Sequence, residues 1–221
     1  MSDFIKIMFV SNMKIDNDTL HSLYTSIRFK DNKIPNLKEK FKIWNEGRNI
    51  YIIMEKSKIE NQDVNFEFIS KKGEVIKVKK FNEQSVNFEK PIVGDFIRVS
   101  GIISYAYKEK ISDGKNIEIC PIDFKGNIKD DSKFAYYLTK NTGLDFEKSI
   151  KHKDRVMINR LFIEDLGLSN DKNKSKVFIK NLIMVNAIVE IVDADIAQSL
   201  YLTSIGKKRS YGLGNLFLEK L

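Results

Sequence analysis

The sequence predicts an α+β fold made of two tandem domains, each with an antiparallel sheet. The first observation is that the chain twice follows the order strand, helix, strand, strand, and then a further strand. The second is that 42% of its 221 residues are hydrophobic, with 15 Phe, so that a core can be buried in each half. The order β-α-β-β-α-β is that of the ferredoxin-like (RRM-like) domain. We therefore expect such domains at residues 1–108 and 115–221.

In the first half, the apolar and β-rich run 4–10 predicts a central strand that is buried on both faces. A helix is expected over about 19–29, because Asp16, Asn17 and Asp18 offer N-caps and the apolar residues that follow have helical spacing. Residues 41–44 and 49–54 predict a hairpin. Residues 56–90 show only a strand pattern at 75–78, and a last strand runs from 96 towards 105.

The second half repeats this order more clearly. Its helix follows Asp131 and stops near Gly143, and a second helix from Ala194 to Thr203 is capped by Asp193. The expected strands are 116–120, 156–166, 177–192 and 216–218. The chain thus ends with a helix, a glycine-rich loop and a strand.

The charge balance favours a polyanionic partner. The chain has 38 Lys and Arg against 30 Asp and Glu, a net charge of +8, and nucleic acid is the commonest partner of such a surface. A basic surface that only aids solubility is the other interpretation. The single Cys120 excludes an internal disulfide framework and a cysteine-based zinc site, and His21 and His152 leave little for another metal, so no cofactor is expected. We see no secretory signal and no membrane-length apolar span, and expect a cytoplasmic protein.

The glycine-rich loop is the most distinctive stretch of the sequence. Gly206, Gly212 and Gly214 surround the basic triplet Lys207, Lys208 and Arg209. Glycine tolerates positive φ and lets backbone N–H groups approach an anion, so this loop suits phosphate. It is neither a dinucleotide fingerprint nor a Walker loop, because the helix precedes the glycines instead of following them. A glycine-rich turn with solvated lysines is the alternative.

Two other groups of residues are candidates for the site. Lys172, Lys174 and Lys176 alternate at the tip of the hairpin expected between the two long strands, which suits the phosphates along a duplex groove, although a solvated turn would look the same. On the first helix, His21 and Arg28 lie along one edge of the apolar stripe. His152 lies in a charged connector and is interpreted as a surface residue or a neighbour of nucleic-acid phosphate.

With these residues, the chain resembles the CRISPR repeat-processing endoribonucleases of the RAMP superfamily, specifically the CasE type of type I-E systems. The stretch from Ser204 to Gly214 resembles the glycine-rich signature of that family, and His21 matches the position of its catalytic histidine on the first helix. Two positions depart from the family pattern. Ser204 stands where the family often has the first glycine, and Asp18 stands where some members have a tyrosine.

The resemblance implies metal-independent cleavage of the CRISPR precursor transcript at each repeat hairpin. A ribose 2′-OH attacks the adjacent phosphate and leaves a 2′,3′-cyclic phosphate, so the protein supplies proton transfer, charge stabilisation and alignment. His21 would transfer the proton, since an unperturbed histidine titrates near ~6.5, and Arg28 would hold phosphate or stabilise developing charge. The implied partners are the repeat RNA hairpin and other subunits of a type I-E interference complex, with no membrane.

Three alternatives stay open. The chain is a hairpin-binding module without cleavage, a structural RAMP subunit that needs partner proteins to bind RNA stably, or a ferredoxin-like protein for a small anion. Incubation with repeat RNA in EDTA separates an enzyme from the others, because only an enzyme yields a shortened product.

Overall fold

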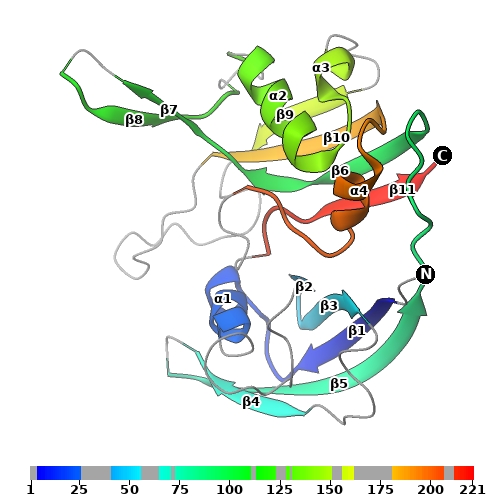
Figure 1. The fold of residues 1–221 in the computed structure, drawn as a ribbon. Coiled ribbons are helices and arrows are strands. Elements are labelled where there is room, and N and C mark those ends of the chain that lie inside the picture. Colours follow the sequence, from blue (N-terminus) through cyan, green and yellow to red (C-terminus); the bar gives the residue numbers. More distant parts are fainter. Residues whose placement is uncertain are drawn as a thin grey trace. The chain divides into compact units, whose positions relative to one another are not determined.

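The computed structural model describes residues 4–25, 41–55, 65–70, 73–110, 113–122, 128–129, 131–150, 156–161, 181–206 and 212–221. The chain forms two compact units, each with its own antiparallel sheet and hydrophobic core (Figure 1). Unit 1 comprises Met1–Glu89, Tyr201–Ser204 and Arg209–Asn215. Unit 2 comprises Lys90–Leu200, Ile205–Lys208 and Leu216–Leu221. The protein is therefore an α+β protein, as the sequence predicts.

The sheet of unit 1 has five strands in the order β2-β3-β1-β5-β4, and all neighbours are antiparallel. The predicted central strand is confirmed, because β1 lies between β3 and β5. The predicted hairpin is also confirmed, and its turn contains Gly47 at φ +64°. The strands are β1 (Phe4–Ser11), β2 (Lys42–Glu46), β3 (Asn49–Glu55), β4 (Phe66–Ile69) and β5 (Val75–Val86).

The core of unit 1 lies on one face of this sheet. Ile5, Ile7 and Phe9 alternate along β1 and pack with Leu20 and Leu23 of helix α1 (Asn17–Thr25). The residues of β1 that point to the other face are half-buried, apart from Phe4, which is buried. Two strands differ from the prediction, because β4 was not expected and β5 runs well past residue 78. The polar residues at the end of β5 do not alternate with apolar ones, so the sequence pattern does not indicate a strand there. They form a strand because they pair with β1.

Unit 2 has a four-stranded antiparallel sheet in the order β11-β6-β10-β9. Side chains of three helices join the inward side chains of this sheet in one hydrophobic core. The strands are β6 (Phe96–Ser104), β9 (Val156–Leu161), β10 (Leu182–Glu190) and β11 (Leu216–Lys220). The helices are α2 (Asp131–Thr142), α3 (Phe146–Ser149) and α4 (Ala194–Ser199).

The strand β6 corrects the expected division of the chain. The sequence pattern assigned it to a first domain at residues 1–108, but β6 pairs with β10 and β11 and buries Ile97, Val99 and Ile103 in the core of unit 2. The units therefore divide at Glu89, and the C-terminal loop contributes to both. Such pairing depends on contacts between residues far apart in the sequence, which local periodicity does not report.

The segment 116–120 is a second correction, because it does not belong to the large sheet. Strand β8 (Asn116–Ile119) pairs with β7 (Tyr107–Lys110) in a two-stranded ribbon that projects from the sheet of unit 2 (Figure 1). Its side chains are mostly exposed, and Ile117 is 41% exposed. The ribbon thus has too little apolar surface to form a strand of the core.

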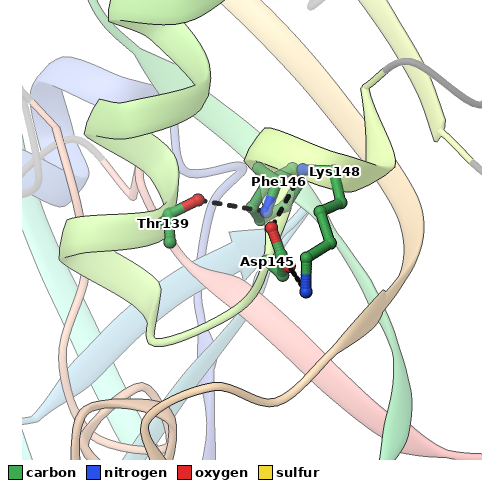
Figure 2. A network of polar contacts seen from close by, with 4 residues as sticks. All are labelled: Thr139, Asp145, Phe146 and Lys148. Atoms are coloured by element: carbon green, nitrogen blue, oxygen red, sulfur yellow. Dashed lines mark hydrogen bonds and ion pairs between the residues drawn. The ribbon is translucent and has the colours of Figure 1, made fainter.

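The helix α2 ends where the sequence predicts, at Gly143. This glycine has φ +68°, and a Cβ on it would lie 2.3 Å from the carbonyl oxygen of Asp193, so no other residue fits. Asp145 then caps α3 by accepting from the backbone N–H of Lys148 (2.9 Å), and Thr139 Oγ1 accepts from the N–H of Phe146 (3.1 Å; Figure 2). The hydrogen bond from the N–H of Phe146 to Thr139 Oγ1 therefore joins α3 to α2.

Helix α4 begins at Asp193, as predicted. Its carboxylate accepts from the N–H groups of Asp195 and Ile196 (3.1 and 3.0 Å), and the helix is shorter than expected, ending at Ser199. The chain then continues through the glycine-rich loop into β11. In the described part of the structure, no helix has the length and apolar character needed to cross a membrane.

Candidate functional site

Four of the predicted site residues lie in the described part of the structure: His21, Gly206, Gly212 and Gly214. The others lie outside the described residues, and their placement stays a prediction. These are Arg28, Lys172, Lys174, Lys176, Lys207, Lys208 and Arg209, together with the surface residue His152.

Helix α1 positions His21 at the edge of the core of unit 1. The helix begins at Asp16, whose carboxylate accepts from the N–H of Thr19 (2.8 Å). Leu20 and Leu23 are fully buried, whereas His21 is half-buried. The packed leucines fix the backbone on both sides of His21, so its imidazole is held on a rigid element at the border between core and solvent.

Gly212 lies directly against this helix. It has φ +79°, and a Cβ on it would be 2.9 Å from Leu20 Cδ2 and 3.7 Å from both the carbonyl oxygen of Ile43 and the Cα of Trp44. Only a glycine allows the backbone to approach α1 and β2 so closely. The structure thus brings the C-terminal glycine-rich loop to Leu20, the residue that precedes His21.

The other two glycines of the loop also have positive φ, +79° at Gly206 and +82° at Gly214. Gly206 lies in unit 2, where a Cβ on it would be 2.7 Å from the carbonyl oxygen of Ser104 at the end of β6. Both values are in the left-handed region that favours glycine. A residue other than glycine would therefore be strained at both positions.

The sequence did not point to Asn215, which organises the base of the loop. Its side chain is buried and makes three hydrogen bonds within unit 1. It accepts from Ser204 Oγ (2.6 Å) and donates to the carbonyl oxygens of Ile43 (2.9 Å) and Gly212 (3.2 Å). The only available signal was an asparagine placed directly between a Gly-Leu-Gly turn and an apolar strand.

A second feature that the sequence did not indicate is Lys42 on β2. It is 2% exposed, and burial lowers the pKa of its ammonium from 10.5 to about 7. In the sheet, Ile53 lies between Lys42 and Lys6, on the face opposite the main core. Lys6 Nζ lies 4.9 Å from the ring centre of Tyr51 and 5.5 Å from that of Trp44, and these two rings are stacked. This face therefore combines two lysines with two aromatic rings.

The donor atoms of a metal site are not gathered anywhere in the described ranges. No group of three or more His, Cys, Asp or Glu residues there could hold a metal ion. What the described site offers is an imidazole on a fixed helix and a glycine turn whose backbone lies beside that helix. This combination suits proton transfer next to a bound phosphate.

Comparison with solved structures shows that the fold of the whole chain occurs in CRISPR endoribonucleases. The chain matches Thermus thermophilus Cse3 bound to an RNA that represents a pre-cleavage complex, with 13% identity, 99% of this chain and 100% of that chain covered, and a TM-score of 0.55. It matches Cas6e from Escherichia coli K-12 with 14% identity, coverage of 99% and 100%, and a TM-score of 0.52. It also matches a chain of a CRISPR RNA-guided surveillance complex in a pre-nicking state, with 12% identity, coverage of 98% and 100%, and a TM-score of 0.52.

These likenesses confirm, at the level of the fold, the resemblance that the sequence carries. No protein-family model matches the sequence. No curated protein matches it either.

Proposed function

We propose that this chain is a CRISPR repeat-processing endoribonuclease of the CasE type, which cuts the precursor transcript within its repeat hairpins. The observation that carries this proposal is the fold likeness to Cse3 and Cas6e over essentially their whole length. The packing of Gly212 against the helix that carries His21 supports it, because the two features of the resemblance meet in one unit.

The strand orders support a tandem ferredoxin-like architecture. In each unit the first strand of the order β-α-β-β-α-β lies inside the sheet. The fourth strand of that order pairs with it on one side, and the third strand, followed by the second, lies on the other side. In unit 1 these are β5, β1, β3 and β2, with β4 added at the edge. In unit 2 they are β11, β6, β10 and β9.

The proposed reaction uses a nucleophile that the RNA itself supplies. The 2′-OH of the nucleotide before the scissile phosphate loses its proton and attacks phosphorus, the bond to the 5′-oxygen breaks, and that oxygen takes up a proton. The products are a 2′,3′-cyclic phosphate and a 5′-OH end, so atoms balance without water or metal. His21 serves as the proton-transfer group, and Arg28 is proposed to stabilise the charge that develops on the phosphate.

Binding of the hairpin is proposed to rest on two basic segments. Lys172, Lys174 and Lys176 would contact phosphates along the stem, and Lys207, Lys208 and Arg209 would contact them from the glycine-rich loop. A-form RNA is recognised mostly by shape and by phosphate contacts, so these cations would supply affinity more than sequence preference. The matching chain of a surveillance complex supports other subunits of an interference complex as further partners, and the substrate implies a cytoplasmic location.

The test is cleavage of a synthetic repeat hairpin RNA in EDTA. We expect a shortened product that ends in a 2′,3′-cyclic phosphate, and no product when the nucleotide 5′ of the scissile phosphate is 2′-deoxy, because the nucleophile is then missing. Cutting of the deoxy substrate would exclude this mechanism. Tight binding without any product would instead identify a cleavage-deficient hairpin-binding subunit.

The contribution of the hairpin lysines is tested by reversing their charge. Replacement of Lys172, Lys174 and Lys176 by glutamate is expected to weaken hairpin binding and to flatten its dependence on salt concentration, because fewer counterions are released. The measurement is Kd across a salt series. A matched triple reversal of exposed lysines on the projecting ribbon (Lys108→Glu, Lys110→Glu and Lys115→Glu) should leave the slope nearer to that of the wild type. An unchanged slope in the hairpin variant would mean that the hairpin does not contact RNA.

A further inference from the structure

The base of the glycine-rich loop is closed by a side-chain hydrogen bond. Ser204 precedes the loop and Asn215 follows it, and Ser204 Oγ donates to Asn215 Oδ1 at 2.6 Å. Asn215 is 4% exposed. A hydrogen bond between neutral groups contributes only modestly to stability, but leaving a buried amide unpaired is costly. The two ends of the loop are therefore held together.

The same asparagine fastens the loop to the sheet of unit 1. Its Nδ2 donates to the carbonyl oxygen of Ile43 at 2.9 Å, and Ile43 lies in β2, the strand at one end of the sheet order. Nδ2 also donates to the carbonyl oxygen of Gly212 at 3.2 Å. One buried side chain thus connects β2, the glycine turn and the entry to the loop.

These bonds determine where the Gly212 turn lies. A Cβ at Gly212 would be 2.9 Å from Leu20 Cδ2, so the turn is in direct contact with α1 at the residue before His21. Nothing in glycine itself keeps the turn there, since a glycine-rich segment has a large conformational entropy when it is not restrained. The turn is restrained because Nδ2 of Asn215 donates both to the carbonyl oxygen of Gly212 and to that of Ile43.

We propose that Asn215, held by Ser204, is a positioning residue that fixes the glycine turn beside His21. This inference rests on the proposed function, because positioning has a consequence only for a reaction at His21. Asn215 would not touch the reacting atoms. It would keep the backbone of the turn, and the RNA phosphate bound to it, aligned with the imidazole. Ser204, which departs from the family pattern, then has a definite role as the donor that orients the amide.

The test compares Asn215→Leu, which keeps the branching of the side chain but not the amide, with Ser204→Ala and with the double variant. We expect Asn215→Leu to lower the single-turnover cleavage rate at saturating protein by about 10- to 100-fold, because small misalignment is costly in rate. The Kd for the hairpin should change by no more than about 3-fold, since the basic side chains are kept. Ser204→Ala should show a smaller loss in cleavage rate. Ser204→Thr keeps a hydroxyl donor, so its cleavage rate should be closer to that of the wild type than the rate of Ser204→Ala.

The double variant decides whether the two residues act together. If Ser204 works through Asn215, the double variant is no slower than Asn215→Leu, whereas independent contributions would multiply. Multiplying losses would overturn the proposal. So would a wild-type rate in Asn215→Leu.

A matched control separates positioning from loss of stability. Thr142 in unit 2 is also buried, and its Oγ1 donates to the carbonyl oxygen of Leu138 (2.7 Å) and accepts from the N–H of Leu144 (3.2 Å). Thr142→Val should lower the Tm yet leave the cleavage rate within about 2-fold. An equal loss of rate in Thr142→Val would assign the effect to stability and overturn the proposal.

Amide hydrogen exchange gives a readout that does not depend on cleavage. In Asn215→Leu the amides of residues 212–214 should exchange at least about 10-fold faster, while those of Leu20 and Leu23 stay protected. If the wild-type protein does not cut RNA, the proposed function fails, and exchange alone then decides the role of Asn215. Unchanged exchange at residues 212–214 would show that Asn215 does not hold the turn.

Discussion

Replacement of His21 by alanine is expected to slow single-turnover cleavage of the repeat hairpin by about 10²- to 10⁴-fold. This is the usual contribution of a general acid–base group. The Kd for the hairpin should stay within a few-fold of the wild type, because a neutral imidazole carries little phosphate-binding energy. The helix itself should persist, since Leu20 and Leu23 provide its buried contacts and Asp16 its N-cap. A loss in rate without a loss in binding would therefore point to chemistry and not to folding.

The matched control for His21 lies on the same helix. Ser22 is also half-buried, and Ser22→Ala places an alanine at the neighbouring position of α1 without removing an imidazole. We expect it to cleave within about 3-fold of the wild type. Equal losses in the two variants would assign the effect to the helix. Full activity in His21→Ala would reject His21 as the proton-transfer group and make Arg28 and His152 the next residues to test.

Replacement of Lys42 by methionine is expected to stabilise the protein at pH 7 and to flatten its stability between pH 7 and 10. Burial lowers the pKa of Lys42 from 10.5 to about 7. In the window between these values, the unfolded chain binds a proton at Lys42 that the folded chain does not. Lowering the pH within the window therefore favours unfolding, and the full penalty is reached below about pH 7.

The size of this effect follows from the linkage between protonation and folding. The free energy of unfolding of the wild type should rise by up to about 1.4 kcal/mol per pH unit across the window. Lys42→Met, which keeps an unbranched chain of similar length, should be more stable at pH 7 by roughly 2 to 4 kcal/mol. Urea unfolding at several pH values measures both quantities.

Lys6 provides the control for this prediction, because the same sheet row contains both lysines. Lys6 is only half-buried, and its ammonium lies over the rings of Tyr51 and Trp44. Lys6→Met should cost about 0.5–1 kcal/mol through the lost cation–π contact and leave the pH slope as in the wild type. If Lys42→Met kept the wild-type slope, Lys42 would be charged in the folded protein over this whole range.

Several features of this protein could be predicted from the sequence because they depend on neighbours along the chain. The β-rich run that forms β1, the caps at Asp16 and Asp193, and the helix stop at Gly143 are local signals, and the structure has each of them. The need for glycine at Gly206, Gly212 and Gly214 follows from the same local logic. His21 came from its resemblance to a family, not from periodicity, which only placed it at the edge of a helix stripe.

Other features were decided by the tertiary structure, because they depend on residues that are distant in the sequence. The membership of β6 in unit 2 follows from its pairing with β10 and β11, and a period of two residues predicts which face a side chain occupies but not which strand is its neighbour. The burial of Lys42 is likewise a result of the fold, because strand pairing places it beside Ile53 of β3. The three hydrogen bonds of Asn215 join β2, the loop entry and the glycine turn, which only folding brings within reach of one amide.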